Sequence, residues 1–253
     1  MPTHLTLDRH LEGLRAAMIA LVRYADRAGL AAEVPTCPGW TVRDLVAHQG
    51  MVHRWAAALL RHEEVEEPEA WEREGAKELD PLEWLRDGAV ELAQVLHEAA
   101  DDVVAPVFLH DAPAPRAFWA RRQCHETTVH ALDAQSAALG RLPSPAEADW
   151  VAEDLALDGI DELLAGFLTR RKSRLRTEEE SVLVVAPDQA EDWWELTLSP
   201  EPAVTVRGSG PAPDDADWVL TGSVRELYLR LWNRTDPPAT DGLDWPALSA
   251  VVW

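Results

Sequence analysis

Residues 36–48, TCPGWTVRDLVAH, join a loop to the start of a helix. The Pro-Gly pair at 38–39 interrupts any regular element before it. Thr41 can then cap a helix, with Asp44 at the third helical position in a capping-box arrangement. The spacing of the apolar residues predicts that this helix runs from Val42 to about Arg61. Its inward face is expected to present side chains three and four residues apart: Leu45, His48, Val52 and Trp55.

Further helices are predicted on both sides of this stretch, because apolar residues recur there at intervals of three and four. The acidic, weakly periodic residues 63–79 are expected to form a long connection or a frayed solvated helix. Helices of this length joined by loops are typical of an up-and-down bundle. The expected ranges are 7–29, 81–100, 116–139 and 146–170.

The character of the sequence changes near residue 170, where a basic run is followed by an acidic one. Short β-prone runs separated by turn residues follow, and residues 223–232 have the pattern of an amphipathic helix. We therefore predict a two-domain α+β protein, with a helical bundle at 1–172 and a small α+β domain at 180–253. The expected strands are 181–186, 193–198, 203–206 and 218–221, with 248–253 as a further candidate.

Composition narrows the class of partner. The 253 residues carry a formal net charge of −22, which disfavours nucleic acid and anionic membranes. Two cysteines cannot form a disulfide framework, and no apolar run approaches the ~20 residues that span a bilayer. We expect a reduced cytoplasmic protein, monomeric or homodimeric. The stretches 40–62 and 115–142 are nevertheless locally cationic, so a small anionic substrate remains admissible.

A possible metal site comes from three residues. Glu126 and His130 are four positions apart on a predicted helix, about 40° apart around its axis and one turn along it. His48 lies on the inward stripe of another helix, and ligands from facing helices converge in a bundle core. Two histidines and one carboxylate suit zinc with an open position, or non-haem iron. The alternatives are a chance pair and a hydrogen-bonded core histidine.

For residues around these three the expectations are less specific. Asp133 shares the face of His130 and can orient its imidazole or form an ordinary salt bridge. Arg54 and Arg122 can hold an anionic substrate or a thiol cofactor, or can be solvated surface charges. The remaining expectations are surface positions for His53, His62 and His125, ordinary packing roles for Cys37 and Cys124, and a lid over the bundle end for Trp40.

Two motifs resemble one family. Residues 36–48 and the stretch HETTVHALDA at 125–134 are similar to the first and second motifs of the mycothiol-dependent maleylpyruvate isomerase family, whose bundles are DinB-like. The resemblance implies that His48, Glu126 and His130 bind a divalent metal, usually taken as zinc. The region after residue 180 is similar to the family's C-terminal domain, which is of the sterol-carrier kind. There the resemblance implies a functional arginine at Arg234, for which a solvated surface charge is the alternative.

The resemblance further implies an enzyme that uses mycothiol, a low-molecular-weight thiol. A metal-bound thiol is deprotonated at neutral pH, and the thiolate is the nucleophile. It can add to an electrophilic double bond and cause isomerisation, or displace a leaving group from a substrate carbon and so give S-transfer. Two alternatives remain at this point. One is a thiol-independent hydrolase that uses metal-bound water, and the other is a non-enzymatic protein that binds a metal or small molecule.

Overall fold

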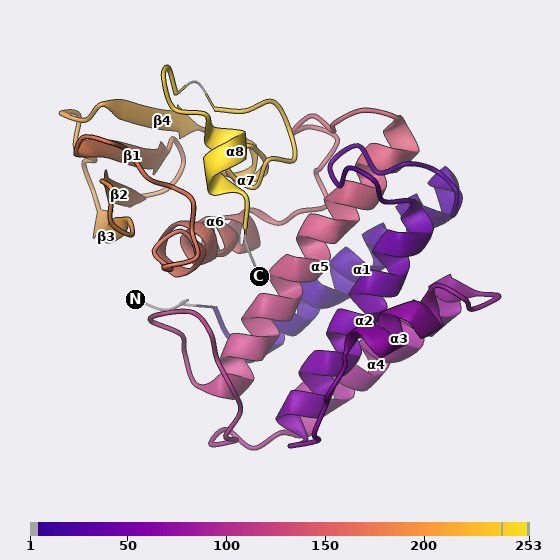
Figure 1. Ribbon diagram of the computed structural model, residues 1–253. Helices are drawn as coiled ribbons and strands as arrows, with labels where there is room; N and C mark the ends of the chain where they lie inside the picture. The colour runs from indigo at the N-terminus through magenta and orange to yellow at the C-terminus, as the bar shows by residue number, and fades with distance from the viewer. Residues whose placement is uncertain (1–4, 239, 252–253) are drawn as a thin grey trace. The chain divides into compact units, whose positions relative to one another are not determined.

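The computed structural model describes residues 5–238 and 240–251. The chain divides into two compact units (Figure 1). The helical unit comprises Leu5–Val107 and Pro113–Pro143. The C-terminal unit contains the described residues of Ser144–Trp253 together with the short segment Phe108–Ala112. The prediction of an α+β protein with a helical bundle first and a small α+β domain second is thereby confirmed.

The helical unit consists of five helices whose starts follow local sequence signals. Thr41 and Asp44 form the expected capping box, and Asp80 caps a helix that begins with proline. The acidic stretch after residue 62, expected as a connection or a frayed helix, contains one short helix. The elements are α1 (Leu7–Ala28), α2 (Val42–Leu60), α3 (Glu69–Gly75), α4 (Pro81–Glu98) and α5 (Pro115–Leu139).

Helix α5 is buried along most of its length. It packs along α1 and also contacts α2, while α2 packs against α4 (Figure 1). Residues 118–129 and 131–136 of α5 are buried without interruption. An ordinary surface helix buries one stripe only, whereas a helix buried all round belongs to the core. Polar side chains on α5 therefore lie inside the protein, where they need partners.

The C-terminal unit is a four-stranded sheet with helices. Its strands are β1 (Ser181–Pro187), β2 (Asp192–Leu198), β3 (Val204–Ser209) and β4 (Trp218–Gly222), in the order β3-β2-β1-β4. Strand β2 pairs with β1 and with β3, both antiparallel, and β4 pairs with β1 in parallel. The remaining elements are α6 (Glu153–Asp161), its π-helical continuation η1 (Glu162–Phe167), α7 (Val224–Leu231) and α8 (Trp245–Ser249).

One side of the sheet packs on α6 and η1. Asp161 at the end of α6 accepts hydrogen bonds from Trp194 of β2 and from Arg207 of β3. Thr205 of β3 donates to the carbonyl of Leu164 in η1. These side chains alternate with outward-pointing ones, as the pleat requires. Together they tie the last helical segment to the sheet.

The domain division differs from the expected one. Residues 146–170 were expected in the bundle, but α6 and η1 belong to the C-terminal unit, and the chain changes unit between Pro143 and Ser144. An amphipathic stripe shows that a helix buries one face but does not show against what. The candidate strand 248–253 is also corrected, because α8 covers its first residues. Residues 252–253 lie outside the described part.

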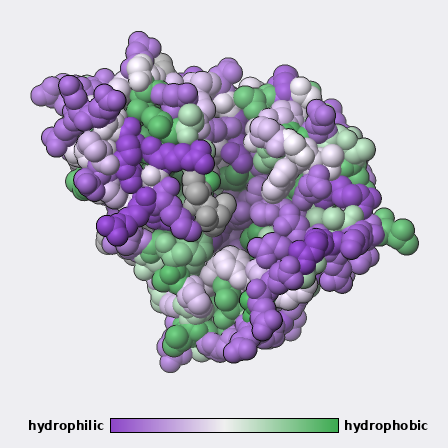
Figure 2. All heavy atoms as spheres, in the orientation of Figure 1, coloured by the Kyte–Doolittle hydropathy of each residue, from purple (hydrophilic) through white to green (hydrophobic). Residues whose placement is uncertain are grey.

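The surface shown in Figure 2 is mainly hydrophilic. Hydrophilic residues cover much of the face seen in Figure 2, and apolar residues interrupt them in places. Among residues 5–238 and 240–251, no helix combines the length and apolarity that crossing a membrane would require.

Candidate metal centre

His48, Glu126 and His130 meet in the helical unit. The Nε2 atom of His130 lies 3.2 Å from Oε1 of Glu126, and Nε2 of His48 lies 4.0 Å from the same oxygen. One ligand atom from each residue lies within 4.8 Å of the other two. Helix α2 supplies His48 and α5 supplies the other two, so the i,i+4 spacing and the inward stripe together produce this convergence.

Each of the three side chains has a second polar atom that faces a different group of the protein. Oε2 of Glu126 accepts a hydrogen bond from Nη2 of Arg122 at 2.8 Å. Nδ1 of His130 donates to Oδ2 of Asp133 at 2.9 Å. Nδ1 of His48 lies 3.7 Å from a carboxylate oxygen of Glu72, an ion-pair distance rather than a hydrogen bond. The remaining ligand atoms, Nε2 of each histidine and Oε1 of Glu126, therefore lie together.

The loop before α2 forms one wall of this centre. Trp40 N–H donates to the carbonyl of Cys37 across a tight turn in which Gly39 adopts φ +86°, a conformation that favours glycine. The Trp40 ring lies 4.9 Å from the ring of His48 and stacks 6.3 Å from that of His130. Trp40 thus covers both imidazoles, which is more specific than the expected lid over the bundle end.

The same loop is bound to α5 through Asp133. Thr36 Oγ1 donates to Oδ1 of Asp133 at 2.5 Å. The Asp133 carboxylate is fully buried and holds the loop with one oxygen and His130 with the other. Cys37 also offers its sulfur close to His130 and Asp133. Asp133 therefore contacts His130, a contact that both expectations for it allow.

The protonation of Glu126 and that of His130 depend on each other. Burial favours the neutral acid of Glu126, but the Arg122 charge and a hydrogen bond with His130 outweigh it and lower the pKa of Glu126 to about 2. Burial likewise opposes protonation of His130. Hydrogen bonds to Asp133 and Glu126 nevertheless raise the pKa of His130 to about 9. Without a metal, His130 carries the proton that a cation would displace.

The three arginines named from the sequence have different surroundings. Arg54 donates to the carbonyls of Gly50 and Trp84 and lies over the Trp84 ring, 3.8 Å from its centroid. Arg122 is 1% exposed and pairs with Glu126. Neither is the solvated surface charge that was one expectation. Arg234 follows α7 in the C-terminal unit and donates to the carbonyl of Trp232.

Two of the three histidines expected at the surface are buried. His62 is exposed as predicted. His53 is 0% exposed, and its Nε2 lies 2.8 Å from Nε2 of Gln49 and 3.0 Å from Oγ1 of Thr127. Burial and the neighbouring Arg54 charge lower the pKa of His53 to about 3. The expected surface position is thus wrong for His53, because a helical angle away from one partner does not imply solvent.

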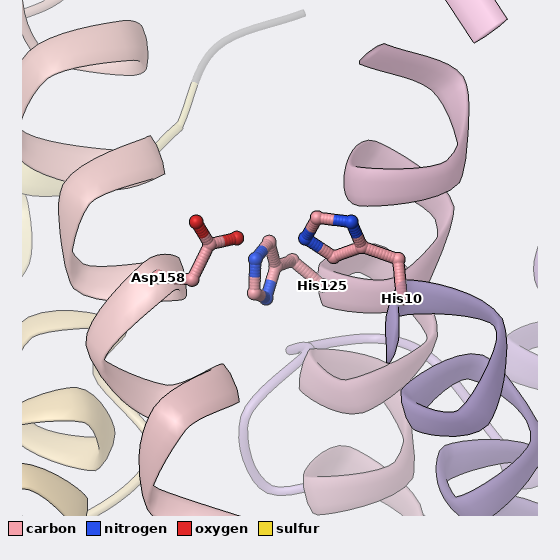
Figure 3. A group of neighbouring side chains, drawn as sticks. All are labelled: His10, His125 and Asp158. Atoms are coloured by element: carbon pink, nitrogen blue, oxygen red, sulfur yellow. The ribbon is translucent and has the colours of Figure 1, made fainter. Parts of the chain in front are cut away.

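His125 is also buried, as are the α5 residues on both sides of it in the sequence. Its ring meets that of His10 on α1 edge to face, with centroids 6.2 Å apart (Figure 3). Sequence reasoning also missed the contacts of Thr36 and Glu72 with the centre. Thr36 had a signal, since it opens the motif at 36–48. Glu72 had none, because it is one of many acids between residues 63 and 83.

Comparison with known proteins gives the family. The sequence profile of the mycothiol maleylpyruvate isomerase N-terminal domain matches residues 11–135, and that of the C-terminal domain of the same proteins matches residues 154–250. The chain belongs to the mycothiol-dependent maleylpyruvate isomerase family. The resemblance read from the two motifs is thereby confirmed. Membership in this family of isomerases also confirms the prediction of an enzyme.

Solved structures of the mycothiol-dependent maleylpyruvate isomerase family have the same fold. A crystal structure of a histidine-to-alanine variant of a mycothiol-dependent maleylpyruvate isomerase is 16% identical, with a TM-score of 0.59. A second structure of such an isomerase is 17% identical, with a TM-score of 0.56. In both cases the match covers 91% of this chain and 91% of the other. No curated protein matches the chain by sequence.

Proposed function

We propose that this protein is a cytoplasmic, mycothiol-dependent enzyme with a divalent metal, and that it acts on a small electrophile by isomerisation or S-transfer. The observation that carries the proposal is the convergence of His48, Glu126 and His130, whose three ligand atoms lie within 4.8 Å of one another. Family membership supports the thiol, because the family profiles are those of mycothiol maleylpyruvate isomerases.

The donor set fits a metal. Two imidazole nitrogens and one carboxylate oxygen are a common catalytic set for zinc, which is the metal we favour, and also suit non-haem iron. The orienting contacts of Asp133 and Arg122 are of the kind that fix metal ligands. A bound divalent metal would supply Lewis acidity and make a coordinated thiol a thiolate at neutral pH.

The chain's own residues would prepare the reaction. His48, Glu126 and His130 hold the metal, and Trp40 limits the access of water to both imidazoles. The locally cationic stretches 40–62 and 115–142 favour an anionic electrophile. For Arg234 we propose a role in catalysis, following the resemblance. Arg54 and Arg122 were expected to hold cofactor, but their contacts with protein groups favour structural roles.

The decisive experiment is metal analysis of the purified protein followed by thiol titration. We expect about one divalent metal per chain, lost in His48→Ala and Glu126→Ala and retained in His62→Ala, which removes an exposed histidine. In cobalt-substituted protein, mycothiol should produce a thiolate-to-metal absorption band. Metal without thiol uptake would contradict the proposal. Hydrolysis without thiol would then indicate a hydrolase, and ligand-induced stabilisation without turnover a binding protein.

A further inference from the structure

The buried pair formed by Arg122 and Glu126 calls for an explanation. The two side chains are 2% and 8% exposed, one turn apart on α5, with Nη2 and Oε2 separated by 2.8 Å. Removing two charges from water is expensive and seldom adds net stability. A fixed positive charge beside a candidate cation site also weakens cation binding. A buried arginine at this position therefore adds little stability and weakens the binding of a cation.

What the arginine achieves is a fixed orientation of the carboxylate. Arg122 holds Oε2, while Oε1 lies 3.2 Å from His130 and 4.0 Å from His48. A carboxylate without such a partner can turn and bind a metal through both oxygens. Held as it is here, Glu126 presents Oε1 to the two histidines and keeps Oε2 on Arg122.

We propose that Arg122 is a positioning residue that keeps Glu126 a one-oxygen ligand and so reserves a metal position for the thiolate. This inference rests on the proposed function. Zinc in catalytic sites takes three protein ligands and leaves the fourth tetrahedral position to water or substrate. If Oε2 also bound while water kept its place, the metal would be five-coordinate, and the carboxylate would crowd the position that the thiolate takes. The Arg122 charge further favours an anionic ligand over neutral water.

The test uses the full-length protein loaded with Co²⁺, since four-coordinate cobalt absorbs visible light more strongly than five-coordinate cobalt. Arg122→Met should keep about one metal per chain, but its visible bands should weaken as the carboxylate binds through both oxygens. Its dissociation constant for mycothiol should rise about tenfold or more, the size of effect usual for groups that orient metal ligands. Arg122→Lys should recover part of both signals, because it retains a charged donor.

Arg116→Met is the matched control. Arg116 is on the same helix and donates to the Leu96 and His97 carbonyls and to Asp101, none of them a metal ligand. Identical cobalt spectra and mycothiol affinities in Arg122→Met and Arg116→Met would overturn the inference. If Arg122→Met does not fold, Arg122→Lys is compared with the unaltered protein instead, and identical cobalt spectra and mycothiol affinities in those two proteins would overturn the inference. Failure of the proposed function would appear earlier, as unaltered protein that takes up no metal or thiol.

Discussion

His130 donates its Nδ1 hydrogen to Asp133 over 2.9 Å, within one turn of α5. The contact leaves only Nε2 of His130 to face Glu126 and His48. It also joins the ligand to the preceding loop, because the other oxygen of Asp133 accepts from Thr36. One buried carboxylate thus sets the ring orientation of a metal ligand and the position of the loop that covers it.

Replacing Asp133 with alanine should therefore weaken metal binding. Loss of an orienting carboxylate usually costs 10- to 100-fold in metal affinity, and we expect a decrease of about this size. Competition with a chromophoric chelator measures it. Asp87→Ala, which removes an exposed carboxylate of α4, should leave the affinity unchanged. Equal affinities in the two variants would contradict the role given to Asp133.

Metal uptake should release a proton. The pKa of His130 is raised to about 9 by Asp133 and Glu126 in the metal-free protein. Near pH 7 its Nε2 is therefore protonated and must lose that proton to bind a cation. We expect about one proton released from His130 per metal, and apparent affinity rising with pH up to about 9. Calorimetry in buffers of different ionisation enthalpy measures the release.

The control for this prediction is Asp133→Asn. An amide in place of the carboxylate removes the negative charge that favours imidazolium, so the pKa of His130 should fall and fewer protons should be released near pH 7. A release that is the same in both proteins would mean that Asp133 does not govern the protonation of His130.

His53 should make the protein less stable in mild acid. Its pKa is about 3 in the folded protein against an ordinary 6.5. Between these values the unfolded chain binds a proton that the folded protein does not, so the stability present above about pH 6.5 is lost as the pH falls. The linked slope approaches about 1.4 kcal/mol per pH unit in this window. Urea unfolding at pH 4.5–7 measures it.

The comparison that isolates this effect is His53→Gln against His62→Gln. The first variant should have a smaller dependence of unfolding free energy on pH, whatever its absolute stability, because the titrating group is gone. The second removes an exposed histidine and should retain the dependence. Parallel curves for all three proteins would show that His53 does not titrate as described.

Gly50→Ala should destabilise the helical unit. A Cβ at this position would lie 2.0 Å from Cζ3 of Trp84, whose ring fills the space beside both Gly50 and Gly75. Overpacking of this kind typically costs about 1–3 kcal/mol. Gly88→Ala offers a comparison, since its Cβ would meet the terminal Nη1 of Arg54 at 2.4 Å. A side-chain end can move more easily than a ring, so we expect a smaller loss, measured by urea unfolding.

Much of the fold could be predicted because its signals are local. Thr41 and Asp44 cap α2 as their spacing indicates, and Asp80 with Pro81 starts α4. The unit to which residues 146–170 belong depends on long-range packing, which an amphipathic pattern does not specify. The same limit applies to His53 and His125. An angle around the helix sets which side such a residue faces, but its burial depends on what packs against that side.

The candidate site shows the same distinction. His48, Glu126 and His130 were identified because an i,i+4 pair and an inward histidine on a facing helix have few ways to meet. Arg122 was noticed for its charge and for lying on the same face as Glu126, yet the contact with Glu126 gives it a different role from the one expected. Glu72 is near His48 only because α3 folds back there, and no local pattern in the acidic stretch indicates this.

The enclosure of α5 has a consequence for how freely this sequence can vary. Residues 118–129 and 131–136 are buried on every side, so almost every position combines a volume constraint with, at Arg122, Glu126 and Asp133, a polar partner to satisfy. In a saturation mutagenesis library selected only for soluble expression, this helix should be the most depleted of substitutions. Exposed positions of α4, such as Val90 at 68% exposure, should accept most replacements.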